Sequence, residues 1–222
     1  AGVEVVTRVN PTHPLARLYH SGSAIGGCAI GDVNGDGRPD LFFAGTDTPN
    51  RLFLQTAPWQ FEEHTTAGIA GGEAWGVGAT MADVDGDGDL DVHVCNYEAA
   101  NHLFRNDGPG PDGRPRFTEC AAAFGLGAID ASVTASFCDY ENDGDLDMFL
   151  LTNRFYREGG EPEGELYTLG ADGEPVVKPE FARYFRLLKL DAKTVLVSDV
   201  GRPDRLYRNE GPDAAGQVRF KD

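Results

Sequence analysis

The apolar residues of this chain fall in short runs that alternate with turns rich in Asp and Gly. Three of these runs, at 41–43, 92–94 and 148–150, follow directly on an acidic turn. In the first two cases a Leu-Phe pair comes next, and then a run led by phenylalanine, at 61–63 or 117–119. Small residues fill the stretch before each later acidic turn. Short apolar runs bounded by turn residues predict β-strands, here about four in each unit.

The acidic turn is part of an internal repeat. Asp83 lies 51 residues after Asp32, and Asp139 lies 56 residues after Asp83. A four-stranded unit of about 50 residues is the size of a propeller blade. The sequence therefore predicts an all-β fold, a partial β-propeller of about three four-stranded blades. The predicted boundaries are 22–75, 76–131 and 132–222 for the repeats, and 1–21 for an N-terminal segment or a strand of a preceding blade.

The third repeat is interrupted. Its segment RLYRN at 205–209 matches HLFRN at 102–106, but it begins 58 residues after Asp147, whereas the earlier segments begin eleven residues after their turns. We therefore expect an insertion of about 47 residues, at 154–203. Because propellers typically have four to eight blades, we also expect this sequence to be a fragment of a longer propeller.

Each acidic turn carries oxygen-bearing side chains at positions 1, 3, 5 and 9 and a glycine at position 6. Ca²⁺ prefers six to eight oxygen ligands at about 2.3–2.6 Å, and position 7 supplies a backbone carbonyl. An EF-hand needs a Glu at position 12, where this chain has Phe43, Val94 and Leu150. We therefore predict about three Ca²⁺ ions, each in a loop between two strands. The predicted ligands are Asp32, Asn34, Asp36, Arg38 and Asp40 in the first loop, Asp83, Asp85, Asp87, Asp89 and Asp91 in the second, and Asp139, Glu141, Asp143, Asp145 and Asp147 in the third.

The alternative is an acidic, solvated turn without a metal, since Asp and Gly both favour turns. Three copies in matching context argue against it, because carboxylates packed into nine residues repel one another unless a cation neutralises them. The third loop is the weakest copy, since Glu141 is one methylene longer than the side chains at the same position of the other loops.

These loops, with the motifs RLFLQ at 51–55, HLFRNDG at 102–108 and RLYRNEG at 205–211, resemble those of FG-GAP/VCBS repeat proteins. That family is related to the integrin α-chain propeller, and its nearest look-alikes are bacterial proteins similar to cartilage acidic protein. The resemblance covers about 22–153 and 204–222. It implies a typically seven-bladed, exported propeller whose loop residues bind calcium. The Phe-Gly/Gly-Ala-Pro hallmark is not intact here, so the ligand face of integrins is not carried over.

The chain is strongly acidic, with 36 acidic and 19 basic residues and a net charge of −17. This excludes nucleic acid as a partner, since nucleic-acid binding needs a basic face, and it disfavours anionic membranes. The sequence has no run of about 18 apolar residues that would predict a membrane span. Weak calcium sites fill where calcium is millimolar, so we expect an extracellular, cell-surface or periplasmic location.

The four cysteines show no C-x-x-C spacing, which argues against zinc. Cys28 and Cys138 lie in stretches of small residues and are expected to be core thiols. Cys95 and Cys120 belong to one repeat, where they either form a disulfide or stay free.

The insertion differs from the repeats in composition and in the spacing of its apolar residues. Its beginning is acidic and loop-like, 179–190 has the spacing of a short amphipathic helix, and 194–197 reads as a strand. One interpretation is a binding elaboration, because long insertions on rigid scaffolds often carry function. The other is a decorated loop whose aromatic face packs on the propeller.

No catalytic constellation is recognisable in the sequence. It has no G-x-S-x-G elbow, and its five histidines, His13, His20, His64, His93 and His102, are scattered. His93 is expected to be packed in the core and His102 to be a solvated strand residue. Trp59 and Trp75 are either sugar-stacking platforms or packing residues.

The sequence therefore favours a non-enzymatic, calcium-stabilised extracellular module for binding or assembly with a protein or carbohydrate ligand. Two alternatives stay open. One is a propeller-based enzyme acting on polysaccharide, such as a lyase, and the other is a packing subunit of a larger extracellular complex.

Overall fold

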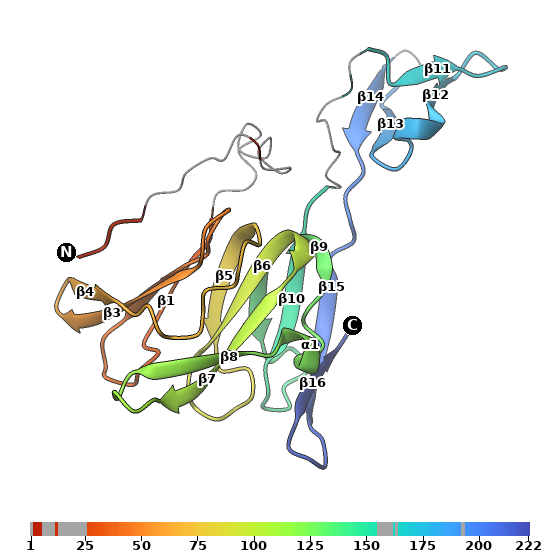
Figure 1. Ribbon diagram of the computed structural model, residues 1–222. Helices are drawn as coiled ribbons and strands as arrows, with labels where there is room; N and C mark the ends of the chain where they lie inside the picture. Colours follow the sequence, from red (N-terminus) through yellow and green to blue (C-terminus); the bar gives the residue numbers. More distant parts are fainter. Residues whose placement is uncertain (1, 6–11, 13–25, 155–161, 163, 192–193) are drawn as a thin grey trace.

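The computed structural model describes residues 2–5, 12, 26–154, 162, 164–191 and 194–222. This part of the chain is built almost wholly from antiparallel β-strands, which confirms the all-β prediction. Figure 1 shows three strand groups following one another in an arc, and we refer to them as blades 1, 2 and 3.

Blade 1 is a four-stranded antiparallel sheet in which each strand pairs with the next along the chain. Its strands are β1 (Cys28–Gly31), β2 (Asp40–Phe43), β3 (Arg51–Ala57) and β4 (Gln60–Glu63).

Blade 2 repeats this order and is followed by a short helix, α1 (Ala121–Phe124). Its strands are β5 (Gly76–Ala82), β6 (Asp91–Ala100), β7 (His102–Pro109) and β8 (Pro115–Glu119).

Blade 3 has the same order although its chain is interrupted. Strand β10 pairs with β15, so Met148 lies opposite Tyr207, as the match between 205–209 and 102–106 requires. Its strands are β9 (Ile129–Cys138), β10 (Asp147–Thr152), β15 (Arg205–Pro212) and β16 (Val218–Lys221). The third blade and its insertion are thus confirmed, while the residue boundaries of the repeats stay a prediction.

Blades 2 and 3 are joined into one curled sheet (Figure 1). The last residues of β6 pair with the first residues of β9, with Tyr97 opposite Ala131 and Ala100 opposite Ile129. The register shifts between Tyr97 and Ala99, where Glu98 has a φ of 55°.

The innermost strands approach each other closely. A Cβ added to Gly27 would lie 2.5 Å from the backbone of Ala79, and one added to Gly78 would lie 2.2 Å from the carbonyl of Val133. The small residues before each acidic turn therefore serve the packing of β1, β5 and β9 around the centre, where larger side chains would clash.

A second close contact recurs at the outer strands. Gly68 and Gly125 have φ values of 86° and 81°, and a Cβ on either would lie 2.5 Å from the carbonyl oxygen of Phe117 or Phe220 in the next outer strand. Gly2 meets the carbonyl of Phe61 in the same way, at 2.3 Å.

The two largest core clusters lie one on each side of blade 2, and a smaller one surrounds Trp75 and Tyr97. Phe42 and Leu52 of blade 1 pack with Val92 and Val94 of blade 2. On the other side Leu103 packs with residues of blade 3 such as Leu150. The blades are therefore held together by burial of apolar side chains between neighbouring sheets.

The insertion forms two hairpins. Strand β11 (Tyr167–Leu169) pairs with β12 (Pro175–Val177), and β13 (Phe185–Lys189) pairs with β14 (Val195–Asp199). The strand expected at 194–197 is thus confirmed. The helix expected at 179–190 is wrong, because only the 3-10 turn η2 (Pro179–Phe181) is helical there. Pairing with β14 overrides the weak helical spacing of 179–190.

The aromatic residues of the insertion pack on one another. Phe185 is buried, and its ring meets that of Phe181 edge-on with centroids 6.5 Å apart. Figure 1 shows the two hairpins standing away from the blades. The structure therefore does not support a loop whose aromatic face packs on the propeller.

All four cysteines are free. Cys95 is buried between blades 2 and 3, and Cys120 donates its thiol hydrogen to the carbonyl of Leu103 at 3.5 Å. Cys28 and Cys138 are exposed, so the expectation that they are core thiols is wrong. They lie on the inner strands of the first and third blades, on faces that no blade covers here. No helix in the described part of the chain is long and apolar enough to cross a bilayer.

Candidate metal centre

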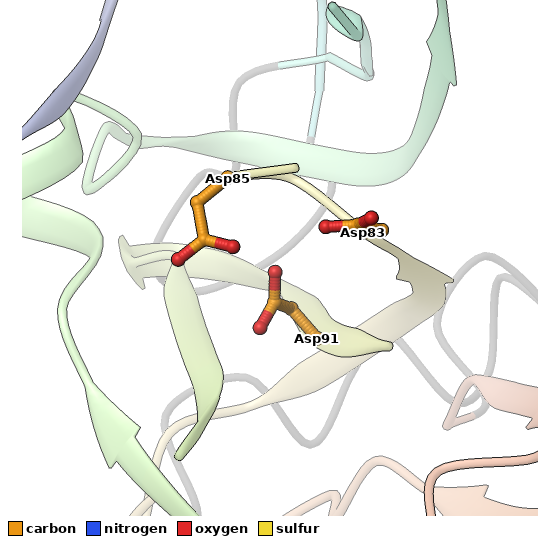
Figure 2. A group of neighbouring side chains, drawn as sticks. All are labelled: Asp83, Asp85 and Asp91. Carbon is orange, nitrogen blue, oxygen red and sulfur yellow. The ribbon is translucent and has the colours of Figure 1, made fainter. Parts of the chain in front are cut away.

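The loop between β5 and β6 brings three carboxylates together. Asp83, Asp85 and Asp91 each place an oxygen within 4.8 Å of the others, and Figure 2 shows the three side chains converging on one space. Like charges this close repel strongly unless a cation lies among them. Oxygen donors of this kind suit a hard cation such as Ca²⁺.

Asp83 shapes the loop through its own hydrogen bonds. Its Oδ1 accepts from the backbone N–H of Gly86 at 2.8 Å and of Asp87 at 3.1 Å, and its Oδ2 accepts from Gly88 at 3.0 Å. Gly88, at position 6, has a φ of 96°, which a residue with a Cβ rarely adopts. The glycine lets the chain turn back around the first carboxylate.

Asp91 ties the loop to the sheet. Its side chain is fully buried, and its Oδ2 accepts from the N–H of Val84 at 2.9 Å while its Oδ1 accepts from the N–H of Asn106 at 2.8 Å. Burial raises the pKa of Asp91 to about 7 despite these two hydrogen bonds. A cation among the three carboxylates would favour the charged form of Asp91.

The same brace recurs in the other two loops. Asp40 accepts from Val33 N at 3.1 Å and from Gln55 N at 2.8 Å, and burial raises its pKa to about 6. Asp147 accepts from the backbone N–H of Tyr140 at 3.2 Å and from the backbone N–H of Asn209 at 2.8 Å. The ninth loop residue therefore joins the loop to the third strand of its blade in all three repeats.

The first loop residue is also equivalent in all three. Asp32 accepts from Asp36 N at 3.1 Å and from Gly37 N at 2.7 Å. Asp139 accepts from Asp143 N and Gly144 N, both at 3.0 Å. The three loops thus share one backbone fold, as the sequence spacing predicts.

The first loop differs in its charge balance. The guanidinium of Arg38 forms an ion pair with Asp36, and its Nε donates to the carbonyl of Gln55 at 2.7 Å. The loop spacing predicts only a backbone carbonyl ligand from Arg38, at position 7, so this ion pair was not expected. A cation at this loop has to compete with Arg38 for the carboxylate of Asp36. The side chain of Asn34 is exposed, and its Oδ1 accepts from the backbone N–H of Asp36 at 3.1 Å.

The third loop carries a carboxylate oxygen without a partner. Oδ1 of Asp145 is buried and accepts no hydrogen bond from any described residue. Burial raises the pKa of Asp145, and the charge of Asp143 raises it further. An unsatisfied buried oxygen fits a bound cation. Glu141 is exposed, and among the described acidic side chains only the second loop brings three carboxylates within 4.8 Å.

The remaining loop residues lie at the surface. Asp87 and Asp89 are exposed, and Asp89 N donates to Asp87 Oδ1 at 2.9 Å. Asp85 is half-buried, and burial and then the charge of Asp87 raise its pKa. The donors are therefore oxygens throughout, which fits calcium and not zinc, a metal that prefers nitrogen and sulfur.

The histidines have structural surroundings. His93 is buried against Phe137, as predicted, and burial lowers its pKa to about 4. His64 is buried, with Nε2 2.8 Å from the carbonyl oxygen of Pro115. His102 is half-buried beside Asn96, so its expected solvation is wrong. His13 and His20 lie outside the described residues.

The tryptophans differ from each other. Trp75 is buried in a small cluster with Tyr97, so it is a packing residue. Trp59 is 81 % exposed at the turn between β3 and β4. The two tryptophans therefore do not form one sugar-stacking surface, because Trp59 is exposed and Trp75 is buried.

Comparison with known proteins identifies the repeat. The model of the FG-GAP-like repeat matches residues 32–94 and 83–150. Each match begins at an acidic loop, runs through the acidic loop of the next repeat and ends in the strand that follows it. The chain is also 26 % identical over 143 residues to cartilage acidic protein 1 of Xenopus tropicalis, which covers 60 % of this chain and 22 % of that protein. This chain belongs to the family of FG-GAP-like repeat proteins.

Proposed function

We propose that this chain is a calcium-stabilised, extracellular β-propeller module that binds a protein or carbohydrate ligand and has no catalytic role. The observation that carries the proposal is the threefold recurrence of one loop geometry, with a buried carboxylate at its ninth position. Asp40, Asp91 and Asp147 each join a loop to the third strand of its own blade.

Each loop would hold one Ca²⁺ through its carboxylates, the side-chain amide of Asn34 in the first loop and the backbone carbonyl of position 7. The bound ion supplies positive charge, and these residues orient it. In the second loop it would neutralise Asp83, Asp85 and Asp91, which otherwise repel one another at 4.8 Å or less. Because a ligand that binds only the folded state stabilises that state, calcium affinity adds to the free energy of unfolding.

Calcium at loops of this kind points to a place where the free ion is abundant. Extracellular modules bind calcium at about 10⁻⁴–10⁻³ M, far more weakly than cytosolic buffers. The similarity to a cartilage protein supports the same location. The chain spans only about a fifth of the length of that relative.

The binding surface would lie away from the calcium loops. The turn between β6 and β7 leaves the sheet at the end opposite the loop between β5 and β6, and the insertion replaces the corresponding turn of blade 3. Long insertions on rigid scaffolds frequently carry binding function. The calcium loops would then serve as the rigid base of the module.

Calorimetric titration of the chelator-treated protein with CaCl₂ tests the metal part of the proposal. We expect about three binding events and a rise in melting temperature of many degrees. Mg²⁺ is the control, because it demands near-ideal octahedral geometry and keeps its water, so it should give a much smaller shift. Equal melting temperatures in calcium and in chelator would refute a stabilising role.

A further inference from the structure

One asparagine of the first loop is placed to lose its side-chain amide. Asn34 is followed by Gly35, and no other asparagine in the sequence precedes a glycine. In such a pair the backbone nitrogen of the glycine can attack the side-chain carbonyl carbon of the asparagine, because a residue without a Cβ allows close approach. Asn34 and Gly35 are both exposed, so water reaches the pair.

This exposure belongs to the loop and not to the place of blade 1 in the chain. Gly86 has the position of Gly35 in the second loop, and it is exposed although blade 2 has a neighbouring blade on each side. Asn142 has the same position in the third loop and is exposed as well. The turn therefore faces solvent in each repeat.

The attacking nitrogen is not engaged elsewhere. The N–H of Gly35 donates to no acceptor among the described residues, whereas the N–H of Gly86 donates to Asp83 Oδ1 at 2.8 Å. The sequence also has seven Asp-Gly pairs, and in every one the glycine N–H donates a hydrogen bond. These glycines are Gly37, Gly86, Gly88, Gly108, Gly113, Gly144 and Gly173. Gly35 is thus the exception among the glycines that follow Asp or Asn.

The carbonyl group under attack is held in position. Asn34 Oδ1 accepts from the backbone N–H of Asp36 at 3.1 Å, which turns the side chain back toward its own backbone as an Asx-turn does. The same N–H would stabilise the negative charge that develops on Oδ1 when the nitrogen of Gly35 attacks. No atom outside the loop stands in the way, because the space beside the Cα of Gly35 is open to 4 Å.

We propose that Asn34 is a site of spontaneous deamidation. The nitrogen of Gly35 forms a bond to Cγ of Asn34, the bond from Cγ to the amide nitrogen breaks, and the proton of the Gly35 nitrogen leaves with that amide as ammonia. Water then opens the cyclic succinimide at one of its two carbonyl groups. The products are an aspartate at position 34 or its β-linked isomer. Water is the only co-reactant.

The two products change the loop in different ways. An aspartate at position 34 adds a carboxylate and gives the first loop the side-chain type that Asp85 supplies in the second. The β-linked isomer adds one atom to the main chain between Asp32 and Asp36 and so moves their carboxylates apart. The effect on calcium affinity rests on the proposed function, whereas the deamidation itself does not.

Peptide mass spectrometry of the whole chain, aged in chelator at neutral pH, tests the proposal. The peptide that contains Asn34 should show the mass gain of NH₂ replaced by OH and should split into two chromatographic peaks, one for each product. Asn142 is the internal control, because it is exposed in an equivalent loop but is followed by Asp143. Its peptide should stay unmodified over the same time.

Gly35→Asn is the matched variant. Asn142 adopts a φ of 59° at the equivalent position, close to the 68° of Gly35, so the variant keeps the loop conformation and adds a Cβ beside the attacking nitrogen. It should abolish the mass gain at Asn34, and a thermal melt of the fresh protein checks that it is folded. An Asn34 peptide that stays unmodified, an Asn142 peptide modified as fast, or a Gly35→Asn variant that ages like the wild type would overturn the proposal.

Calcium titration of fresh Asn34→Asp protein separates this proposal from the proposed function. The variant carries the first product from the start, and it should bind calcium more tightly at the first loop because the charge count of the ligands sets the affinity. An unchanged affinity would contradict a calcium site at this loop. The mass measurement in chelator would still decide whether Asn34 loses its amide.

Discussion

Arg202 reaches from the end of the insertion to Glu98 on β6, where its Nη2 donates to both carboxylate oxygens at 2.7 and 2.9 Å. Its Nη1 donates to Asp130 of β9 at 2.8 Å, and only 12 % of the Arg202 side chain is exposed. The backbone of Glu98 is in the left-handed conformation, which is rare for residues with a Cβ. One guanidinium therefore joins the base of the insertion to blades 2 and 3.

Replacing Arg202 should loosen this base. Arg202→Ala removes the partner of Glu98 and leaves the mostly buried Asp130 paired with Arg205 alone, so it should cost about 1–3 kcal/mol. Urea unfolding should show this loss, and limited proteolysis should cut the insertion faster. Lys189→Ala removes a largely exposed ion pair with Glu174 and should change stability by less than about 1 kcal/mol. Equal effects of the two variants would contradict the role of Arg202.

Asp85 and Asp91 should respond differently to loss of charge. Asp85→Asn keeps an oxygen at the position that Asn34 occupies in the first loop, but it removes one negative charge from the proposed calcium site. Because Asp85 accepts only a long loop bond among the described residues, from Asp87 N at 3.4 Å, the variant should weaken calcium binding and lower the melting temperature only when calcium is present. Asp91→Asn leaves the N–H of Val84 or Asn106 without an acceptor. It should therefore cost about 1–3 kcal/mol even in chelator.

Thermal melts in calcium and in chelator distinguish these two variants. Glu73→Gln, at an exposed acid outside the loops, is the matched control and should behave as the wild type in both buffers. If Asp85→Asn destabilised the chelated protein as much as Asp91→Asn does, Asp85 would be a structural residue and not a ligand.

Calcium affinity should depend on pH near neutrality. Burial raises the pKa of Asp91 to about 7 and that of Asp40 to about 6, so calcium has to displace a proton below these values. The metal-free folded protein holds these protons more tightly than the unfolded chain, and its stability should fall as pH rises from about 4 to 7. The calcium-bound protein should show the opposite trend.

Calorimetric titrations at pH 5.5, 6.5 and 8 measure this linkage. We expect affinity to rise with pH, and proton release on binding to be detectable at pH 5.5 in buffers of different ionisation enthalpy. An affinity that does not change over this range would show that these carboxylates are already ionised or do not bind the metal.

The first loop should bind calcium more tightly without its arginine. Arg38→Gln frees Asp36 from a competing cation. Exposed ion pairs of this kind contribute about 0.2–1 kcal/mol, so affinity at this loop should rise by roughly 1.4- to 5-fold. The measurement is calcium titration in a background where Asp85→Asn and Asp143→Asn weaken the other loops. Arg114→Gln, which breaks a pair with Glu62 outside the loops, should leave the affinity unchanged.

The strands and loops were predictable because their signals are local. The spacing of Asp83, Asp85 and Asp91 indicates both the turn and the convergence of carboxylates. The Leu-Phe pairs indicate the third strand of blades 1 and 2, and Leu206-Tyr207 indicates that of blade 3. The hydrogen bond from Asn106 of β7 to Asp91 could not be predicted from the loop spacing, although an Asp precedes the second strand in all three repeats. The ion pair of Arg38 was missed because it depends on where a long side chain turns, which spacing does not determine.

The insertion was harder to predict for a physical reason. Residues 185–189 have apolar side chains at helical spacing, but their structure depends on a partner strand that begins at Val195. The exposure of Cys28 and Cys138 likewise depends on which neighbouring blade is present. Properties that depend on contacts with other segments cannot be predicted from the local sequence.

The close approach of Gly68 to Phe117 and of Gly125 to Phe220 sets the pitch between successive blades with main-chain atoms alone. The side chains packed between blades can then differ from one blade to the next, as Phe42 and His93 do at equivalent positions, without changing the curvature of the arc. A methyl group at either glycine would push neighbouring blades apart and open the arc. The spacing between neighbouring blades therefore depends on the absence of a side chain at these two glycines.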